Sequence, residues 1–238
     1  CWAMGLTQQP NGVAVIQELV NLLLMGGHVG RQGAGFCPVR GHSNVQGDRT
    51  VGIWEAPSDS FLDHMESGLG FPMPRHHGYD VVNAIRAMIE GKVGVFFCMG
   101  GNFHSATPDT NATAEGMTRI PMTVQVSTKL NRSHLITGET AFILPCLGRT
   151  ELDEQSAGPQ FVTVENSMGI VHRSNGGLAP ASPHLLSEPD IVGRLAMATL
   201  GNSPLDWKTL ASNYDLIRDL MQNSLAGFDN YNERVRQE

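Results

Sequence analysis

Residues 93–102 read Val-Gly-Val-Phe-Phe-Cys-Met-Gly-Gly-Asn, an apolar run that stops at two glycines. A run this short and this rich in strand-forming residues is typical of a strand buried on both faces, as in a parallel sheet. Similar apolar segments follow at 122–127 and 140–144, and helical patterns at 80–90 and 111–119 alternate with them. This order predicts an α/β fold with a Rossmann-like parallel sheet and helices on both faces, a three-layer αβα arrangement.

The segments outside this core have different patterns. Residues 12–25 carry apolar side chains at helical spacing, whereas 56–78 contains three prolines and predicts a long irregular Gly/Pro-rich insertion. Residues 160–165 and 169–174 alternate around a turn, which predicts a β-hairpin. Two final helices are expected at 189–200 and 205–226.

These patterns divide the chain into three parts. Residues 1–55 carry a glycine-dense loop after the first helix, and 56–78 form the irregular connection. Residues 79–238 form the α/β domain, which ends with the hairpin and the two helices.

Composition excludes several classes of protein. The chain has 238 residues, 41% hydrophobic and 16% charged, so it is too apolar for a disordered segment. Its net charge of −7 and the lack of a basic patch argue against nucleic-acid binding. No apolar run approaches the length of a membrane span.

The four cysteines lie far apart and form no CxxC pair, so a disulfide framework is not expected. Reduced thiols predict a cytoplasmic protein. The first residue is Cys1 rather than methionine, which predicts that the chain is a piece of a longer polypeptide.

Two strand ends form the first candidate site. The strand that ends at Met99 is followed by Gly100-Gly101-Asn102 and Asp109, and the next strand ends in Ser127-Thr128-Lys129. Ligands of open α/β sheets bind outside the carboxyl ends of the strands, where glycines let backbone N–H groups reach phosphate oxygens. The ends predict a site for a nucleotide diphosphate. The alternative is that the glycines only form a tight turn, and no GxGxxG or P-loop is present.

The second candidate site is the loop 38–47, which places Arg, His, Ser, Asn and Gln between glycines. A fixed guanidinium among many hydrogen-bond donors suits an anionic substrate or a phosphate. The alternative is a solvated loop with an ordinary surface arginine.

Five ordered motifs resemble molybdopterin oxidoreductases, in particular the catalytic (alpha) subunits of formate dehydrogenases. Residues 40–47 resemble the R-G-x-N-N-V-Q-G signature of that family. Residues 2–8 resemble W-G-M-G-x-T-Q, and 26–35 resemble T-G-N-x-G-K-x-G-A-G. Residues 99–102 resemble M-G-E-N, and 141–145 resemble A-D-V-I-L-P. The pattern is most similar to the cytoplasmic formate-dehydrogenase-like subgroup.

The resemblance implies a cofactor and roles for individual residues. In the family, two molybdopterin guanine dinucleotides (bis-MGD) hold one Mo or W atom. Arg40 would be the catalytic residue that orients a small anion such as formate. The residues that would bind the cofactor are Met4, Thr7, Gln8, His42, Gln46, Gly100, Gly101, Asn102, Asp109, Gln125, Ser127 and Thr128.

The sequence also departs from the family. His42-Ser43 replaces the usual Gln-Asn, which bears on formate as the substrate, and Gly101 and Phe142 replace a common Glu and Asp. The [4Fe–4S] segment and the residue that ligates the metal are not in this chain, so no metal ligand is assigned. The resemblance therefore implies partners: the remainder of the polypeptide and an electron-transfer protein. A non-catalytic scaffold of the same fold and an unrelated Rossmann-like nucleotide module are the alternatives.

Overall fold

A computed structural model describes residues 1–39 and 41–237. The chain forms two compact units. The first unit comprises Cys1–Ile53 together with Thr163–His172, and the second comprises Trp54–Val162 together with Arg173–Glu238. Each unit is described on its own.

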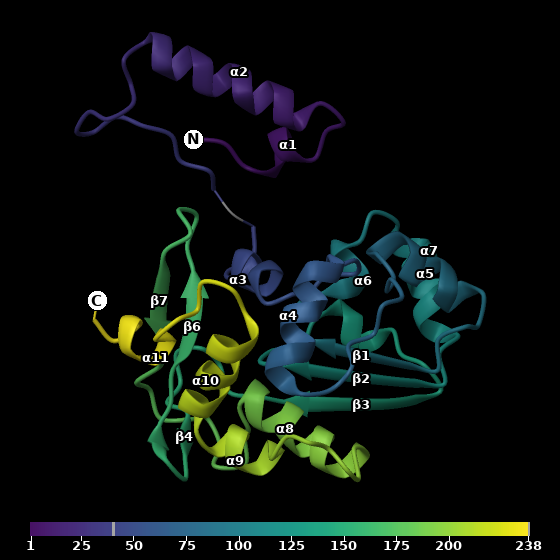
Figure 1. The fold of residues 1–238 in the computed structure, drawn as a ribbon. Helices are drawn as coiled ribbons and strands as arrows, with labels where there is room; N and C mark the ends of the chain where they lie inside the picture. The colour runs from purple at the N-terminus through teal and green to yellow at the C-terminus, as the bar shows by residue number, and fades with distance from the viewer. Residues whose placement is uncertain (40, 238) are drawn as a thin grey trace. The chain divides into compact units, whose positions relative to one another are not determined.

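The second unit is built on a three-stranded parallel sheet, which confirms the α/β fold predicted from the sequence. Its strands, in spatial order, are β1 (Val95–Met99), β2 (Met122–Ser127) and β3 (Thr140–Pro145). Met99 pairs with Val126, and Val126 pairs with Leu144. The three strands therefore end at the same edge of the sheet (Figure 1).

Helices cover both faces of this sheet. They are α5 (Val81–Ile89), α6 (Phe103–Ala106), α7 (Thr110–Thr118), the 3-10 turn η1 (Arg132–Leu135) and α8 (Glu188–Thr199). Figure 1 shows α8 and the α5–α7 pair on opposite sides of the sheet. On one face, Val126 packs with Cys146 and with Ile191 of α8. Its neighbour Gln125 points to the other face, where it donates a hydrogen bond to the Ser133 carbonyl of η1 (2.9 Å).

The outer strands are less covered than the sequence predicts. The run 93–99 reads as a strand buried on both faces, yet Val95 is 57% exposed and Phe97 is 36% exposed. Phe142 of β3 is 49% exposed. The reason is the size of the sheet: with three strands, β1 and β3 are both edges, and only β2 has a neighbour on each side.

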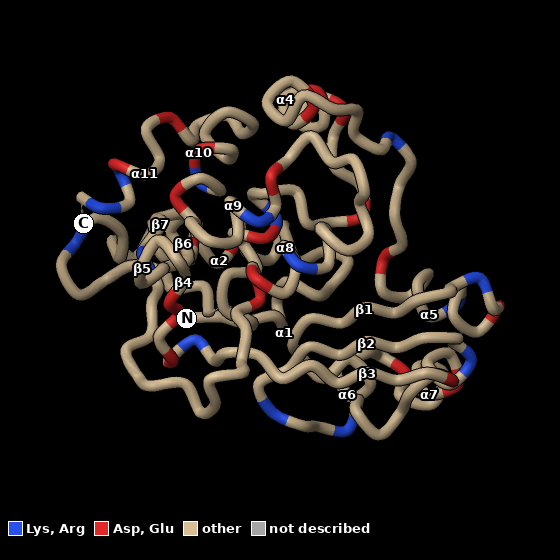
Figure 2. Tube along the Cα trace, turned by 90° about the horizontal axis from the view of Figure 1, so that it is seen from below, with Lys and Arg blue, Asp and Glu red and all other residues tan. Residues whose placement is uncertain are grey.

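The segment predicted as an irregular insertion contains a helix, so that prediction is wrong for residues 59–69. Helix α4 (Asp59–Leu69) begins where the Ser58 side chain accepts the N–H of Phe61, and it ends at Gly70, whose φ is 77°. Acidic positions gather on α4 (Figure 2). Arg75 bonds two of them, Asp63 at 2.7 Å and Glu66 at 2.5 Å, and so ties the proline-containing segment to the helix.

The C-terminal part also corrects a prediction. The apolar spacing predicts one helix at 205–226, but the chain forms α9 (Trp207–Ser212) and α10 (Tyr214–Ser224). Asn213 interrupts the helix because its backbone is extended (φ −149°, ψ 104°) and its side chain accepts the N–H of Asp215. A short helix, α11 (Tyr231–Arg234), follows.

Short strands complete the fold. Strands β4 (Glu154–Gln155) and β5 (Gly158–Pro159) pair antiparallel. Strands β6 (Val162–Glu165) and β7 (Val171–Ser174) pair across a turn, which confirms the predicted hairpin. The Asn166 side chain stabilises that turn by accepting the N–H groups of Met168 and Ile170.

The first unit contains three helices in its described residues. These are α1 (Met4–Thr7), α2 (Gly12–Met25) and α3 (Val45–Thr50). Helix α2 has the bounds that its apolar spacing predicts. Trp2 forms a parallel bridge with Pro38, so the N-terminal segment lies beside the end of the glycine-dense loop. In the described residues, no helix combines the length and hydrophobicity that a membrane crossing requires.

Close packing of α4 on α10 depends on Gly68. A Cβ atom at this position would lie 2.4 Å from the Asn223 carbonyl oxygen and 2.6 Å from the Ser224 Cα. We expect Gly68→Ala to lower the free energy of unfolding by about 1–3 kcal/mol, because two helix backbones must separate. Urea denaturation measures this. The control is Gly201→Ala, where an added Cβ meets nothing within 4 Å, and an equal loss in both variants would contradict the packing argument.

Candidate functional site

The loops that follow β1 and β2 are hydrogen-bonded to each other. Asn131 donates from its side-chain amide to the Gly101 carbonyl (2.8 Å). Ser133 donates its hydroxyl proton to the Asn102 side-chain oxygen (2.9 Å) and accepts the N–H of His104 (2.9 Å). Gly100–Asn102 and the segment after Ser127 therefore lie at one edge of the sheet. The structure brings these predicted site residues together.

The two glycines after β1 adopt backbone conformations that side chains disfavour. Gly100 and Gly101 have φ values of 71° and 74°, and an added Cβ at either would meet nothing within 4 Å. The Gly100 N–H donates to the Val126 carbonyl (2.8 Å), which fixes the turn to the central strand. The space beside the glycines is open, so a ligand could approach the backbone there.

Asp109 and Gln125 both have structural partners. Asp109 is exposed, and one of its carboxylate oxygens accepts the N–H groups of Asn111 and Ala112 (3.0 Å each), which caps α7. Gln125 is only 3% exposed, and its amide is committed to Ser133. A direct contact of Gln125 with a ligand stays a prediction.

The segment after β2 carries exposed polar groups. Ser127 donates its hydroxyl proton to the Lys129 carbonyl (2.6 Å). Three further polar residues of this segment, Thr128, Lys129 and Arg132, are exposed. Thr128 also lies near the third loop, because a Cβ built on Gly148 would be 4.0 Å from its Cγ2. All three loops at the carboxyl edge are thus neighbours.

His134 has a buried nitrogen at this edge. Its Nδ1 accepts the backbone N–H of Asn131 (3.0 Å) and completes a capping box on η1. The tautomer that accepts at Nδ1 carries its proton on Nε2. Nε2 is buried and has no partner among the described residues. The spacing of His134 in the sequence gave no sign of this arrangement.

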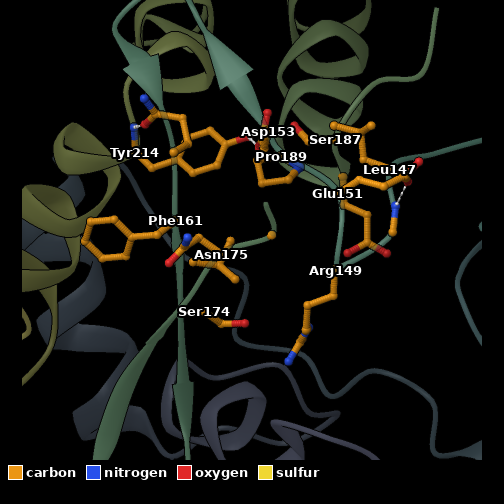
Figure 3. A pocket seen from close by; sticks show the side chains of 15 residues that line it. Leu147, Arg149, Glu151, Asp153, Phe161, Ser174, Asn175, Ser187, Pro189 and Tyr214 are labelled. Carbon is orange, nitrogen blue, oxygen red and sulfur yellow. Dashed lines mark hydrogen bonds between the residues drawn. The ribbon is translucent and has the colours of Figure 1, made fainter. Parts of the chain in front are cut away.

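A cavity of about 110 Å³ lies after β3 (Figure 3). It is lined by Leu147, Arg149, Glu151 and Asp153 from the segment after β3, and by residues from the hairpin, α8 and α10. The Glu151 carboxylate accepts two backbone N–H groups, from Gly148 and Ala181 (2.6 Å each). Both bonds lower the pKa of Glu151 below its usual range, and the bond from Gly148 has the larger effect.

Tyr214 closes one wall of the cavity. Its phenol donates to Asp153 (2.5 Å) and accepts from the Ser187 hydroxyl (2.6 Å), while its backbone N–H donates to Gln160 (2.8 Å). Burial, and then the Asp153 carboxylate, raise the pKa of the phenol far above its ordinary value. Tyr214 is therefore a neutral strut that joins α10 to the loop after β3. Sequence reasoning missed it, because its partners lie 27 to 61 residues away.

The two cysteines near the sheet, Cys98 and Cys146, are free thiols that are partly or fully buried. Burial raises the pKa of Cys146 to about 11 and also raises the pKa of Cys98. A thiol with a raised pKa is protonated at neutral pH and is a poor nucleophile or metal ligand. Within residues 1–39 and 41–237, no three His, Cys, Asp or Glu side chains converge on a potential metal site.

The first unit holds the other predicted site residues. Met4 lies next to Gly41, since a Cβ on that glycine would be 3.4 Å from the Met4 sulfur. Thr7 donates to the Met4 carbonyl (3.3 Å) and Gln8 to the Met4 sulfur (3.8 Å), so these three residues form one small cluster. His42 is exposed. Arg40, the predicted catalytic residue, lies outside the described residues.

Gln46 is hydrogen-bonded to Glu165, a residue that no motif in the sequence connects with the candidate site. Its amide donates to one Glu165 carboxylate oxygen (2.6 Å), and Thr50 donates to the other (2.8 Å). The Glu165 backbone N–H donates to the Asn44 side-chain oxygen (2.8 Å). The segment that resembles the family signature is therefore held by a glutamate 119 residues away from Gln46.

Comparison with known proteins finds close relatives along the whole chain. The chain is 54% identical over 99% of its length to "Uncharacterized oxidoreductase Mb2924c" of Mycobacterium bovis. It is 48% identical over 99% of its length to "Protein YdeP" of Escherichia coli K12. The chain is similar to one segment of these proteins. It spans about 30% of the length of the curated relatives it matches.

Weaker similarity reaches a protein with a more specific name. Over 42% of the chain, it is 32% identical to "Putative formate dehydrogenase SAUSA300_2258" of Staphylococcus aureus, and this match covers 11% of that protein. No protein-family model matches the chain. The comparisons thus connect the chain to proteins named as oxidoreductases.

The Glu151 carboxylate should stabilise the loop after β3 in a pH-dependent way. Its folded pKa is lowered, so its contribution is present above the unfolded pKa and is lost as the pH falls through the folded pKa. We expect Glu151→Gln to lower the urea midpoint at pH 7, and the difference from the wild type to shrink in acid. Glu154→Gln, at a nearby exposed glutamate, is the control. A difference that does not change with pH would contradict the assignment.

Proposed function

We propose that this chain is the molybdopterin guanine dinucleotide-binding portion of a Mo or W oxidoreductase that oxidises formate or a similar small anion. Three findings support the proposal. The five motifs resemble that family, the relatives are named as oxidoreductases, and one partial relative is named as a putative formate dehydrogenase. Free cysteines and the family pattern favour a cytoplasmic protein.

The observation that carries the proposal is the open glycine turn at the carboxyl edge of the parallel sheet. Gly100 and Gly101 leave space beside the backbone, and Asn131 fixes the turn to the next loop. Ligands of open α/β sheets occupy this edge. Exposed Lys129 and Arg132 add positive charge, which suits a diphosphate.

We assign to the described residues the roles that the resemblance implies. In the second unit, the dinucleotide would lie against Gly100, Gly101, Asn102, Asp109, Ser127 and Thr128. Gln125 would assist this binding, and it holds the Ser133 carbonyl through its side-chain amide. In the first unit, Met4, Thr7, Gln8, His42 and Gln46 would contact the cofactor. The Oε1 atom of Gln46 is buried and has no hydrogen-bond partner among residues 1–39 and 41–237, and a bound ligand often satisfies such an atom.

Arg40 would orient the substrate anion, because a planar guanidinium matches a carboxylate in bidentate fashion. The bound metal would supply the two-electron chemistry, and a [4Fe–4S] cluster of the full-length protein would pass the electrons on. The chain's own residues bind and orient; they contribute no metal ligand in this proposal.

Analysis of the purified full-length protein tests the cofactor directly. We expect molybdenum or tungsten, pterin, and two guanine nucleotides released per metal atom. A protein with iron–sulfur but no pterin would favour the scaffold alternative. A guanine nucleotide without metal or pterin would favour a simple nucleotide-binding module.

Asp109 tests the base-binding part of the site. Its second carboxylate oxygen is the candidate acceptor for the guanine N–H groups. Asp109→Ala would also remove the α7 cap, at a cost of about 1 kcal/mol, whereas Asp109→Ser keeps a capping oxygen. We expect Asp109→Ser to preserve the unfolding midpoint and to lower guanine nucleotide content severalfold. Unchanged content in the serine variant would remove Asp109 from the site.

A further inference from the structure

Glu165 lies at the end of β6 and bonds three residues of the loop and helix that carry the family signature. Each contact uses a different atom of Glu165. Its two carboxylate oxygens accept hydrogen bonds from Gln46 and Thr50, and its backbone N–H donates to the Asn44 side chain. Asn44 precedes α3 with a left-handed backbone (φ 63°). Its side-chain oxygen would be 2.2 Å from a Cβ on Gly47, so the loop closes tightly at this point.

The chemistry of the carboxylate decides which way the Gln46 amide faces. An ionised carboxylate only accepts hydrogen bonds, so the amide must turn its NH₂ group toward Glu165. The amide is planar, and its carbonyl oxygen Oε1 therefore points away from Glu165. Oε1 is buried and has no partner among the described residues. A buried carbonyl without a donor is costly, which makes a donor from a ligand favourable there.

We propose that Glu165 is a positioning residue that fixes the Gln46 amide so that its carbonyl oxygen accepts a hydrogen bond from an N–H group of the cofactor. This inference rests on the proposed function. The ligand group at Gln46 is then an N–H donor such as the amino-substituted ring edge of a pterin. Formate and the ionised diphosphate bridge of a dinucleotide present oxygens that accept hydrogen bonds, so neither belongs at this atom.

The test uses cofactor retention in the full-length protein, measured as the rate of pterin loss after dilution into buffer without cofactor. Glu165→Met keeps the length of the side chain but removes both acceptors, and should speed pterin loss about five- to tenfold. Glu165→Gln keeps an acceptor oxygen for Gln46, while the Thr50 hydroxyl can accept from its new NH₂ group. It should restore retention to near the wild-type value.

Two controls separate positioning from general support of the loop. Thr50→Val removes the other side-chain bond to the same carboxylate and should leave pterin retention unchanged. In a Gln46→Met background, Glu165→Met should cause no further loss, since it acts through Gln46. Urea midpoints show whether each variant is folded. If Glu165→Met does not fold, Glu165→Asp, which withdraws the carboxylate by one methylene, should give the accelerated loss instead.

The outcomes distinguish this inference from the function on which it rests. A wild-type protein without pterin contradicts the proposed function and overturns this inference with it. A wild-type protein that holds pterin, with Glu165 variants that retain it equally well, overturns the inference alone. Equal losses in Thr50→Val and in the Glu165 variant, or additive losses with Gln46→Met, also overturn it.

Discussion

Parallel pairing of β1, β2 and β3 is the constraint on which the second unit depends. Parallel strands need crossover connections, which α7 and η1 supply, and the register makes the three strands finish together. Every strand therefore delivers its following loop to the same edge. Hydrogen bonds between those loops, such as the one from Asn131 to Gly101, hold the loops together at that edge.

The two units bring distant segments of the chain together in different ways. In the second unit, neighbouring strands bring together segments that are about 30 residues apart, such as Gly101 and Asn131. In the first unit, a single carboxylate at Glu165 holds Gln46 and Thr50 across more than 110 residues. In both cases, hydrogen bonds within the chain orient the polar groups that we propose for ligand binding.

Much of the fold could be predicted because its signals are local. The apolar run before Gly100 predicts β1, and the spacing in 12–25 predicts α2. The prolines near α4 predict a loop in place of this helix, although Ser58 and Gly70 mark its ends. The break at Asn213 depends on a backbone conformation that the apolar spacing does not show. Contacts of Glu165 and Tyr214 span long stretches of sequence, and no local pattern predicts such pairs.

We propose that the edge formed by Gly100–Asn102 and the segment after Ser127 receives the dinucleotide. An experimental structure of the full-length protein isolated with its native cofactor tests it most directly. We expect density for a nucleotide diphosphate against the backbone of Gly100 and Gly101, with the base near Asp109. A dinucleotide bound elsewhere, with this edge facing solvent, would contradict the proposed site.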